Sequence, residues 1–146
     1  MPRPIEEIFT YFSDARNLAE ITPPWMGFHI LTQGKIEMRV GAKIQYRIGV
    51  HGIPMRWTTE IREWTPPHRF IDVQLSGPYA LWHHTHRFDS RDGGTRIRDT
   101  VHYRLPFGPL GRIVNRLFVA RDVGRIFDYR AQRIRERFGA APEPAP

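Results

Sequence analysis

Cysteine is missing from this chain of 146 residues. Its absence excludes disulfides, a thiolate nucleophile and a cysteine metal site. No apolar run approaches the roughly 20 residues that a membrane-spanning helix needs, and the N-terminus lacks the basic-then-apolar pattern of a signal peptide. We therefore expect a soluble, cytoplasmic protein with no transmembrane segment. The length suits one domain with one hydrophobic core.

Lysine is nearly absent as well, with two lysines against twenty arginines, and the net charge is +7. The arginines are spread along the whole chain. A charge excess of this sign attracts nucleic acid or an anionic membrane surface non-specifically. Because no nucleic-acid-binding motif accompanies the charge, we expect no specific nucleic-acid partner. A basic adaptor that uses the arginines of the last helix is the weakest functional alternative.

Helical signals lie near the two ends of the chain. Pro4, followed by two glutamates, starts a helix that runs to about Phe12. Asp14 can cap a second short helix, which the prolines after Thr22 must end. A long apolar stripe near the other end predicts one helix over residues 110–138, and it consists of Leu110, Ile113, Val114, Leu117, Phe118, Phe127, Ile134 and Phe138. Such a helix is long enough to cross a whole sheet.

Between these helices, apolar and polar residues alternate with a period of two, which predicts antiparallel strands with one covered face. In the strand from Phe70 to Leu75 we expect Ile71, Val73 and Leu75 to point inward, and Asp72 and Gln74 outward. The arginines at positions 47, 87, 96 and 98 should face water. We expect residues 1–139 to form the domain and residues 140–146 to be a disordered tail.

The most informative stretch is a predicted hairpin whose tight turn is Asp92-Gly93-Gly94. Alternation places Trp82, His84 and His86 on the inward face of its first strand. On the second strand, Asp99 shares a face with Val101 and Tyr103. His84 and Asp99 should therefore lie opposite or diagonal to each other.

Several motifs in order, among them Ile21-Thr22-Pro23-Pro24-Trp25, Trp64-Thr65-Pro66-Pro67, Gly77-Pro78-Tyr79 and Trp82-His83-His84-Thr85-His86, resemble the bacterial ligand-binding SRPBCC proteins. These belong to the START-like superfamily, related to polyketide cyclase/dehydrase proteins. The resemblance implies an α+β helix-grip fold, in which a curved antiparallel sheet wraps around a long C-terminal helix, with two short helices near the N-terminus. It also implies an apolar cavity between sheet and helix.

One feature departs from that family. Its members normally begin with a strand before the first helix, whereas Met1-Pro2-Arg3-Pro4 enters the helix almost at once. Either the start is assigned too late or the sheet lacks an edge strand. A missing strand would expose unpaired backbone groups and invite a homodimer through the uncovered edge.

The cluster of His84, His86 and Asp99 has three interpretations. A hydrogen-bonded structural cluster at the cavity wall is the plainest. Alternatively, His84 held by Asp99 is a candidate acid/base pair for a polyketide cyclase or dehydratase. The spacing His84-Thr85-His86 also suits two metal ligands, with Asp99 as a third, but the resemblance implies no metal and no cofactor.

Our first hypothesis from the sequence is a binding module for a small hydrophobic ligand, lipid or polyketide-like. An apolar wall with a few polar groups is what such a site requires. No serine, cysteine or lysine nucleophile with a partner is evident, so we expect binding rather than covalent catalysis. The predicted ligand-binding residues are Tyr46, Trp57, Trp82, His84, His86, Asp99, Val101, Tyr103 and Leu117.

Overall fold

The protein is described by a computed structural model that covers residues 1–50 and 52–140. Its centre is a six-stranded antiparallel sheet in which neighbouring strands follow one another in chain order. The strands are β1 (His29–Ile30), β2 (Lys43–Val50), β3 (Ile53–Thr65), β4 (Arg69–Ser76), β5 (Leu81–Arg91) and β6 (Gly94–Arg104). The predicted meander of antiparallel strands is confirmed.

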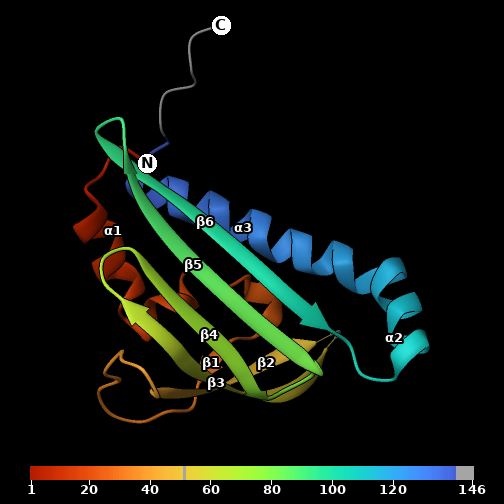
Figure 1. Ribbon diagram of the computed structural model, residues 1–146. Coiled ribbons are helices and arrows are strands. Elements are labelled where there is room, and N and C mark those ends of the chain that lie inside the picture. The colour runs from red at the N-terminus through yellow and green to blue at the C-terminus, as the bar shows by residue number, and fades with distance from the viewer. Residues whose placement is uncertain (51, 141–146) are drawn as a thin grey trace, which may run out of the picture.

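The helices lie in two groups. Near the N-terminus are α1 (Ile5–Phe12) and the short 3-10 helices η1 (Ala15–Ala19) and η2 (Pro24–Met26). The C-terminal group is continuous and consists of α2 (Gly108–Val114), the π-helical turn η3 (Asn115–Val119) and α3 (Ala120–Phe138). Figure 1 shows α3 running along the long strands β5 and β6, with α1 near one end of it and α2 at the other. None of the described helices is long and apolar enough to cross a membrane.

The hairpin of β5 and β6 has the predicted two-residue turn. Arg91 pairs with Gly94, and the residues between them, Asp92 and Gly93, have φ angles of 50° and 74°. Two successive residues in the left-handed region fit the right-handed twist of the flanking strands. The turn sets a register in which His86 pairs with Asp99 and Trp82 with Tyr103.

The register of β4 corrects one prediction from alternation. Phe70 pairs with His86, and Asp72 pairs with His84. Directly paired residues share a face of the sheet, so Asp72 points toward the concave face with the histidines. The expectation that Asp72 faces outward is wrong, and Leu75, expected inward, is exposed.

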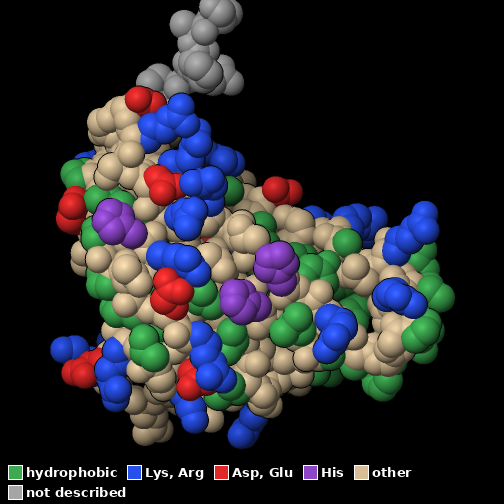
Figure 2. All heavy atoms as spheres, viewed as in Figure 1, with side chains coloured by type: hydrophobic (Ala, Val, Ile, Leu, Met, Phe, Trp, Pro, Cys, Tyr) green, Lys and Arg blue, Asp and Glu red, His purple; other side chains and the backbone are tan. Residues whose placement is uncertain are grey.

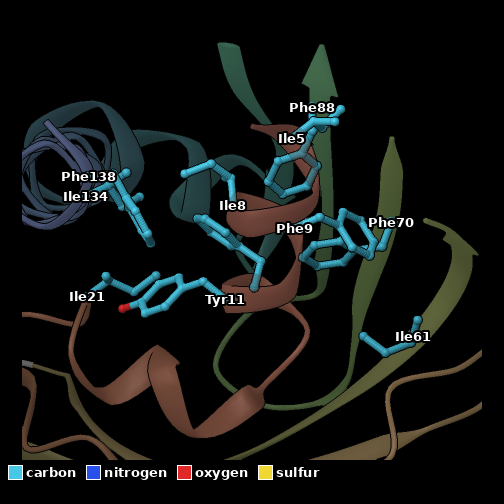
Figure 3. Close-up of a cluster of buried hydrophobic side chains, with 11 residues drawn as sticks. Ile5, Ile8, Phe9, Tyr11, Ile21, Ile61, Phe70, Phe88, Ile134 and Phe138 are labelled. Atoms are coloured by element: carbon cyan, nitrogen blue, oxygen red, sulfur yellow. The ribbon is translucent and has the colours of Figure 1, made fainter. Parts of the chain in front are cut away.

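The hydrophobic core fills one end of the molecule. Figure 3 shows the aromatic and aliphatic side chains of α1 meeting the sheet on one side and the last turns of α3 on the other. The rings of Phe9 and Phe88 lie 5.2 Å apart, and those of Tyr11 and Phe138 lie 5.1 Å apart. The cluster is made of Ile5, Ile8, Phe9, Tyr11, Phe12, Ile21, Ile61, Phe70, Phe88, Ile134 and Phe138. It fixes α1 and the end of α3 to the sheet.

The helix predicted for residues 110–138 is present, but its apolar stripe is only partly buried. The π-helical turn at 115–119 adds a residue to one turn, which rotates the following face by roughly 100°. C-terminal to it, Ile134 and Phe138 are buried against the core. N-terminal to it, the apolar residues of α2 are exposed. The first turns of this helix therefore project beyond the core.

Residues 1–3 make a short contact with the start of β6. The Met1 amino group donates to the Thr95 carbonyl at 2.9 Å, and the Thr95 N–H donates to the Met1 carbonyl at 2.8 Å. Within residues 1–50 and 52–140, no further strand pairs with β6, so β6 is an edge of the sheet. The expected tail at 140–146 lies outside the described residues except for residue 140.

Candidate functional site

A cavity of about 950 Å³ lies between the concave face of the sheet and α3. It occupies the part of the molecule that the core leaves unfilled. Residues from β2 to β5 form its floor, while Val123, Ile126 and Phe127 of α3 form its roof. Its volume lies within the range of cavities that hold small ligands.

Aromatic rings make up much of the cavity wall. Trp57 is 5% exposed, stacks on Tyr46 at 5.8 Å and meets the edge of Trp82 at 5.2 Å. The polar tips of these rings have partners, because Thr59 Oγ1 lies 3.0 Å from the Trp57 indole nitrogen and 3.2 Å from the Tyr46 hydroxyl. Burial raises the pKa of Tyr46 far above its ordinary value. The wall therefore presents apolar surface with few free polar groups.

Two histidines and two aspartates form a buried polar cluster beside this wall. His86 Nε2 lies 2.7 Å from Asp72 Oδ2, a hydrogen bond, and His86 Nδ1 lies 2.9 Å from Asp99 Oδ1. His84 is held more loosely, with Nδ1 3.5 Å from Asp72 Oδ2 and Nε2 3.4 Å from Asp99 Oδ1. The two imidazole rings lie 3.7 Å apart between the two carboxylates. We call these four residues the His/Asp cluster.

The two histidines differ in their protonation. Burial alone lowers the pKa of His86, but the charge of Asp99 and the hydrogen bond to Asp72 outweigh it, so its pKa is raised. Burial and the neighbouring His86 charge lower the pKa of His84. Although burial raises a carboxyl pKa, the imidazole groups hold the pKa of Asp72 below and that of Asp99 well below the ordinary value. At neutral pH the cluster thus holds two carboxylates and a neutral His84, and the two carboxylates favour the charged form of His86.

Three atoms of the cluster lack a hydrogen-bond partner among the described residues: His84 Nε2, His86 Nδ1 and Asp99 Oδ1. They lie close to one another, but the angles do not suit hydrogen bonds. Buried polar groups of this kind call for an explanation, such as water or a functional role. Since His84 lines the cavity, a polar group of a ligand in the cavity can approach its imidazole.

Asp72, His84 and His86 also satisfy the geometric requirement for a metal site, because one ligand atom from each lies within 4.8 Å of the others. Two imidazoles and one carboxylate suit Fe(II) or Zn(II). However, Nε2 of His86 and Oδ2 of Asp72 already form the 2.7 Å hydrogen bond. Two of the three side chains that could ligate a metal are thus hydrogen-bonded to each other.

The predicted ligand-binding residues divide into two groups. Tyr46, Trp57, Trp82, His84 and His86 line the cavity. The other four do not line it: Asp99 lies behind the histidines, Val101 and Tyr103 lie on β6, and Leu117 is 60% exposed on η3. The Tyr103 ring packs against Trp82 at 5.9 Å and so supports the wall from behind.

Sequence reasoning missed Asp72, which binds His86, and Arg130, whose charge lowers the pKa of Asp72 from α3. Both line the cavity. Asp72 is found once β4 is paired with β5, because the residues paired with two inward histidines must also point inward. Arg130 carries no comparable signal, since it is one of many arginines on the helix.

The sequence of residues 1–128 matches the family model described as polyketide cyclase/dehydrase and lipid transport. The chain belongs to this family. No curated protein matches the sequence. The matched residues include all six strands and every residue that lines the cavity except Arg130. The resemblance drawn from the sequence motifs is thereby confirmed at family level.

Solved structures agree on the fold. Protein Ms6760 from Mycobacterium smegmatis is 20% identical, with a TM-score of 0.66 over 92% of this chain and 83% of that one. Protein CV1439 from Chromobacterium violaceum is 14% identical, with a TM-score of 0.69 over 97% and 93%. Ara h 8.0201 is also 14% identical, with a TM-score of 0.58 over 91% of each chain. The helix-grip fold predicted from the sequence is confirmed.

Proposed function

We propose that this family member binds a small, mainly apolar molecule in the cavity between the sheet and α3. The observation that carries the proposal is the cavity of about 950 Å³, with its aromatic wall and the His/Asp cluster beside it. Transfer of an apolar ligand from water to this aromatic wall would be favourable in free energy, because it removes apolar surface from water. A carbonyl or hydroxyl group on the ligand would find its partner at His84.

A blocked cavity tests this function. Val123 lines the cavity from α3, and Ala120, one turn earlier, is exposed and does not line it. Val123→Trp should fill the space and weaken binding of an apolar fluorescent dye at least tenfold, while Ala120→Trp should leave binding unchanged. Native mass spectrometry of the purified wild type would identify a retained lipid or polyketide. Equal dye binding by all three proteins would contradict the proposal.

A second candidate is a cyclase or dehydratase that moves a proton through His84. The observation that favours it is the neutral His84 at the cavity wall, with an unpartnered Nε2 and the carboxylate of Asp99 at 3.4 Å. A neutral imidazole can accept a proton from a carbon beside a carbonyl group and return it to a leaving hydroxyl group. Asp99 would stabilise the charged imidazole during this transfer.

The variant His84→Gln separates binding from catalysis. If the cluster is structural, the substitution should lower the free energy of unfolding by about 1 to 3 kcal/mol, the cost of an unsatisfied buried partner. If His84 is catalytic, turnover of a polyketide-like substrate should fall by roughly 10² to 10⁴ in a protein that still folds and binds. We expect the structural result, because no nucleophile with an activating partner lines the cavity among the described residues.

The other partner predicted from the sequence is a second copy of the chain at an uncovered sheet edge, and β6 is one of the two edges of the sheet. The strand carries Arg96, Arg98 and Arg104, all exposed. Charged residues of this kind discourage pairing between edges, so a homodimer is the weaker proposal. Light scattering on the purified protein tests it. The cytoplasmic location and a role as a basic adaptor stay predictions of the sequence.

A further inference from the structure

The segment from Phe107 to Phe118 exposes an unusual number of large apolar side chains. Phe107 is 81% exposed, Leu117 60% and Ile113 57%. The complete set, which we call the mouth patch, is Phe107, Leu110, Ile113, Val114, Leu117 and Phe118. Single exposed apolar residues are common, but a contiguous patch marks an interaction surface. Within a helical segment, residues three and four positions apart are neighbours, so the patch is contiguous.

This patch lies at the opening of the cavity. Phe107, Leu110, Val114 and Phe118 line the cavity as well as being exposed. Trp25, whose ring packs against Tyr129 of α3, shares both properties. A molecule that enters or leaves the cavity at this end must pass these residues. Whatever covers the mouth patch therefore also covers the route to the cavity.

The surroundings of the mouth patch are basic. Residues 107–126 contain Arg112, Arg116, Arg121 and Arg125, and Asp122 is the only acidic residue in that range. Figure 2 shows apolar and basic side chains side by side on the lobe that α2 forms in Figure 1. An apolar helix face flanked by arginines is the composition of helices that lie in the interface of an anionic bilayer.

We propose that the mouth patch docks on the surface of an anionic lipid bilayer. The apolar side chains would enter the region between headgroups and acyl chains, while the arginines would bind the lipid phosphates. A second copy of the chain is a poorer occupant, because its mouth patch would bring the same arginines into opposition. A ligand would then pass between bilayer and cavity without crossing water. That transfer role rests on the proposed function, whereas docking itself does not.

The test uses sedimentation with vesicles, in which Ile113 is the informative position. It belongs to the mouth patch but does not line the cavity. The wild type should bind vesicles of phosphatidylcholine with phosphatidylglycerol, and bind phosphatidylcholine alone much more weakly. Ile113→Asp should reduce binding at least tenfold. Val40→Asp is the matched control, since Val40 is 58% exposed and lies outside the patch, and it should bind as the wild type does.

The arginines give a second, independent variant. Replacing Arg112 and Arg116 by glutamine should lower the partition coefficient by about fivefold for each arginine near the surface. Arg96→Gln, on β6, should have little effect. Added salt should weaken binding of the wild type, because it screens the lipid charge. Circular dichroism and thermal unfolding establish that each variant is folded.

Each outcome decides the proposal. Equal binding of Ile113→Asp and Val40→Asp would overturn it, as would wild-type binding that ignores lipid charge. A stable dimer that Ile113→Asp separates, without vesicle binding, would show that a second copy covers the patch and would overturn it too. Loss of dye binding in the cavity, with vesicle binding intact, would contradict the proposed function and leave docking supported.

Discussion

His86 donates a 2.7 Å hydrogen bond from Nε2 to Oδ2 of Asp72, and both side chains are largely buried. The other ring nitrogen of His86 lies 2.9 Å from Asp99. An imidazole between two carboxylates holds its proton more tightly than a free one, which agrees with the raised pKa of His86. The attraction between His86 and Asp72 therefore stabilises the folded protein beside the cavity. Removing either side chain should cause a measurable loss of stability.

The first prediction concerns this buried pair. Asp72→Ala should lower the free energy of unfolding by about 3 to 5 kcal/mol, because it removes one of the two carboxylates that face the buried His86. Denaturation by urea would measure the change. The control is Asp89→Ala, which breaks the exposed pair with Arg98 at 2.6 Å and should cost much less, because solvent screens an exposed pair. Similar decreases in the free energy of unfolding for the two variants would show that burial does not strengthen the interactions of the His/Asp cluster.

The second prediction is a loss of stability as pH rises above 6.5. The folded pKa of His86 is above its ordinary value of 6.5, so its charge stabilises the protein fully below pH 6.5. That contribution disappears as pH rises through the raised pKa. The groups responsible are Asp99 and Asp72, which together outweigh the opposing effect of burial. Melting temperatures recorded across this range would show the decline.

His86→Gln should remove that decline, whereas His29→Gln, at an exposed histidine on β1, should keep it. A contrasting loss is expected on the acid side. The pKa values of Asp72 and Asp99 are depressed below the ordinary 3.8, so their contribution is present above pH 3.8 and is lost as pH falls through the depressed values. A flat profile from neutral to alkaline pH in the wild type would contradict the raised pKa of His86.

The third prediction uses Trp82, a half-buried residue whose ring borders the cavity. Truncation of a fully packed aromatic ring costs about 3 to 5 kcal/mol, much of it for the hole left behind. Because the hole beside Trp82 already exists, Trp82→Ala should cost clearly less and should change dye affinity. Phe88→Ala, at a ring that is 1% exposed in the core, should show the full loss with unchanged affinity. Equal losses would mean that Trp82 is ordinary core.

Alternation in the sequence was sufficient to place His84, His86 and Asp99 on one face. Each lies in a strand with a clear period of two, and Asp92-Gly93 leaves little freedom in the register between the strands. The order of helices and strands also follows from local signals, since Pro4 and Gly139 bound the helices and glycine turns separate strands. The facing of these side chains and the order of the elements depend on residues that are close together in the chain. They can therefore be predicted without knowledge of the tertiary structure.

Only the tertiary structure decided the inward position of Asp72 and the exposure of the mouth patch. Both faces of β4 carry apolar residues, so the alternation within β4 does not determine which face points inward. The pairing of β4 with β5 determines it. The apolar stripe in the sequence of α2 predicts that the helix has an apolar face. It does not predict which part of the protein, if any, that face contacts. The core is anchored at Ile134 and Phe138, while the π turn at 115–119 separates α2 from that anchor. Long-range packing thus determined which apolar surface is core, which is cavity and which remains open.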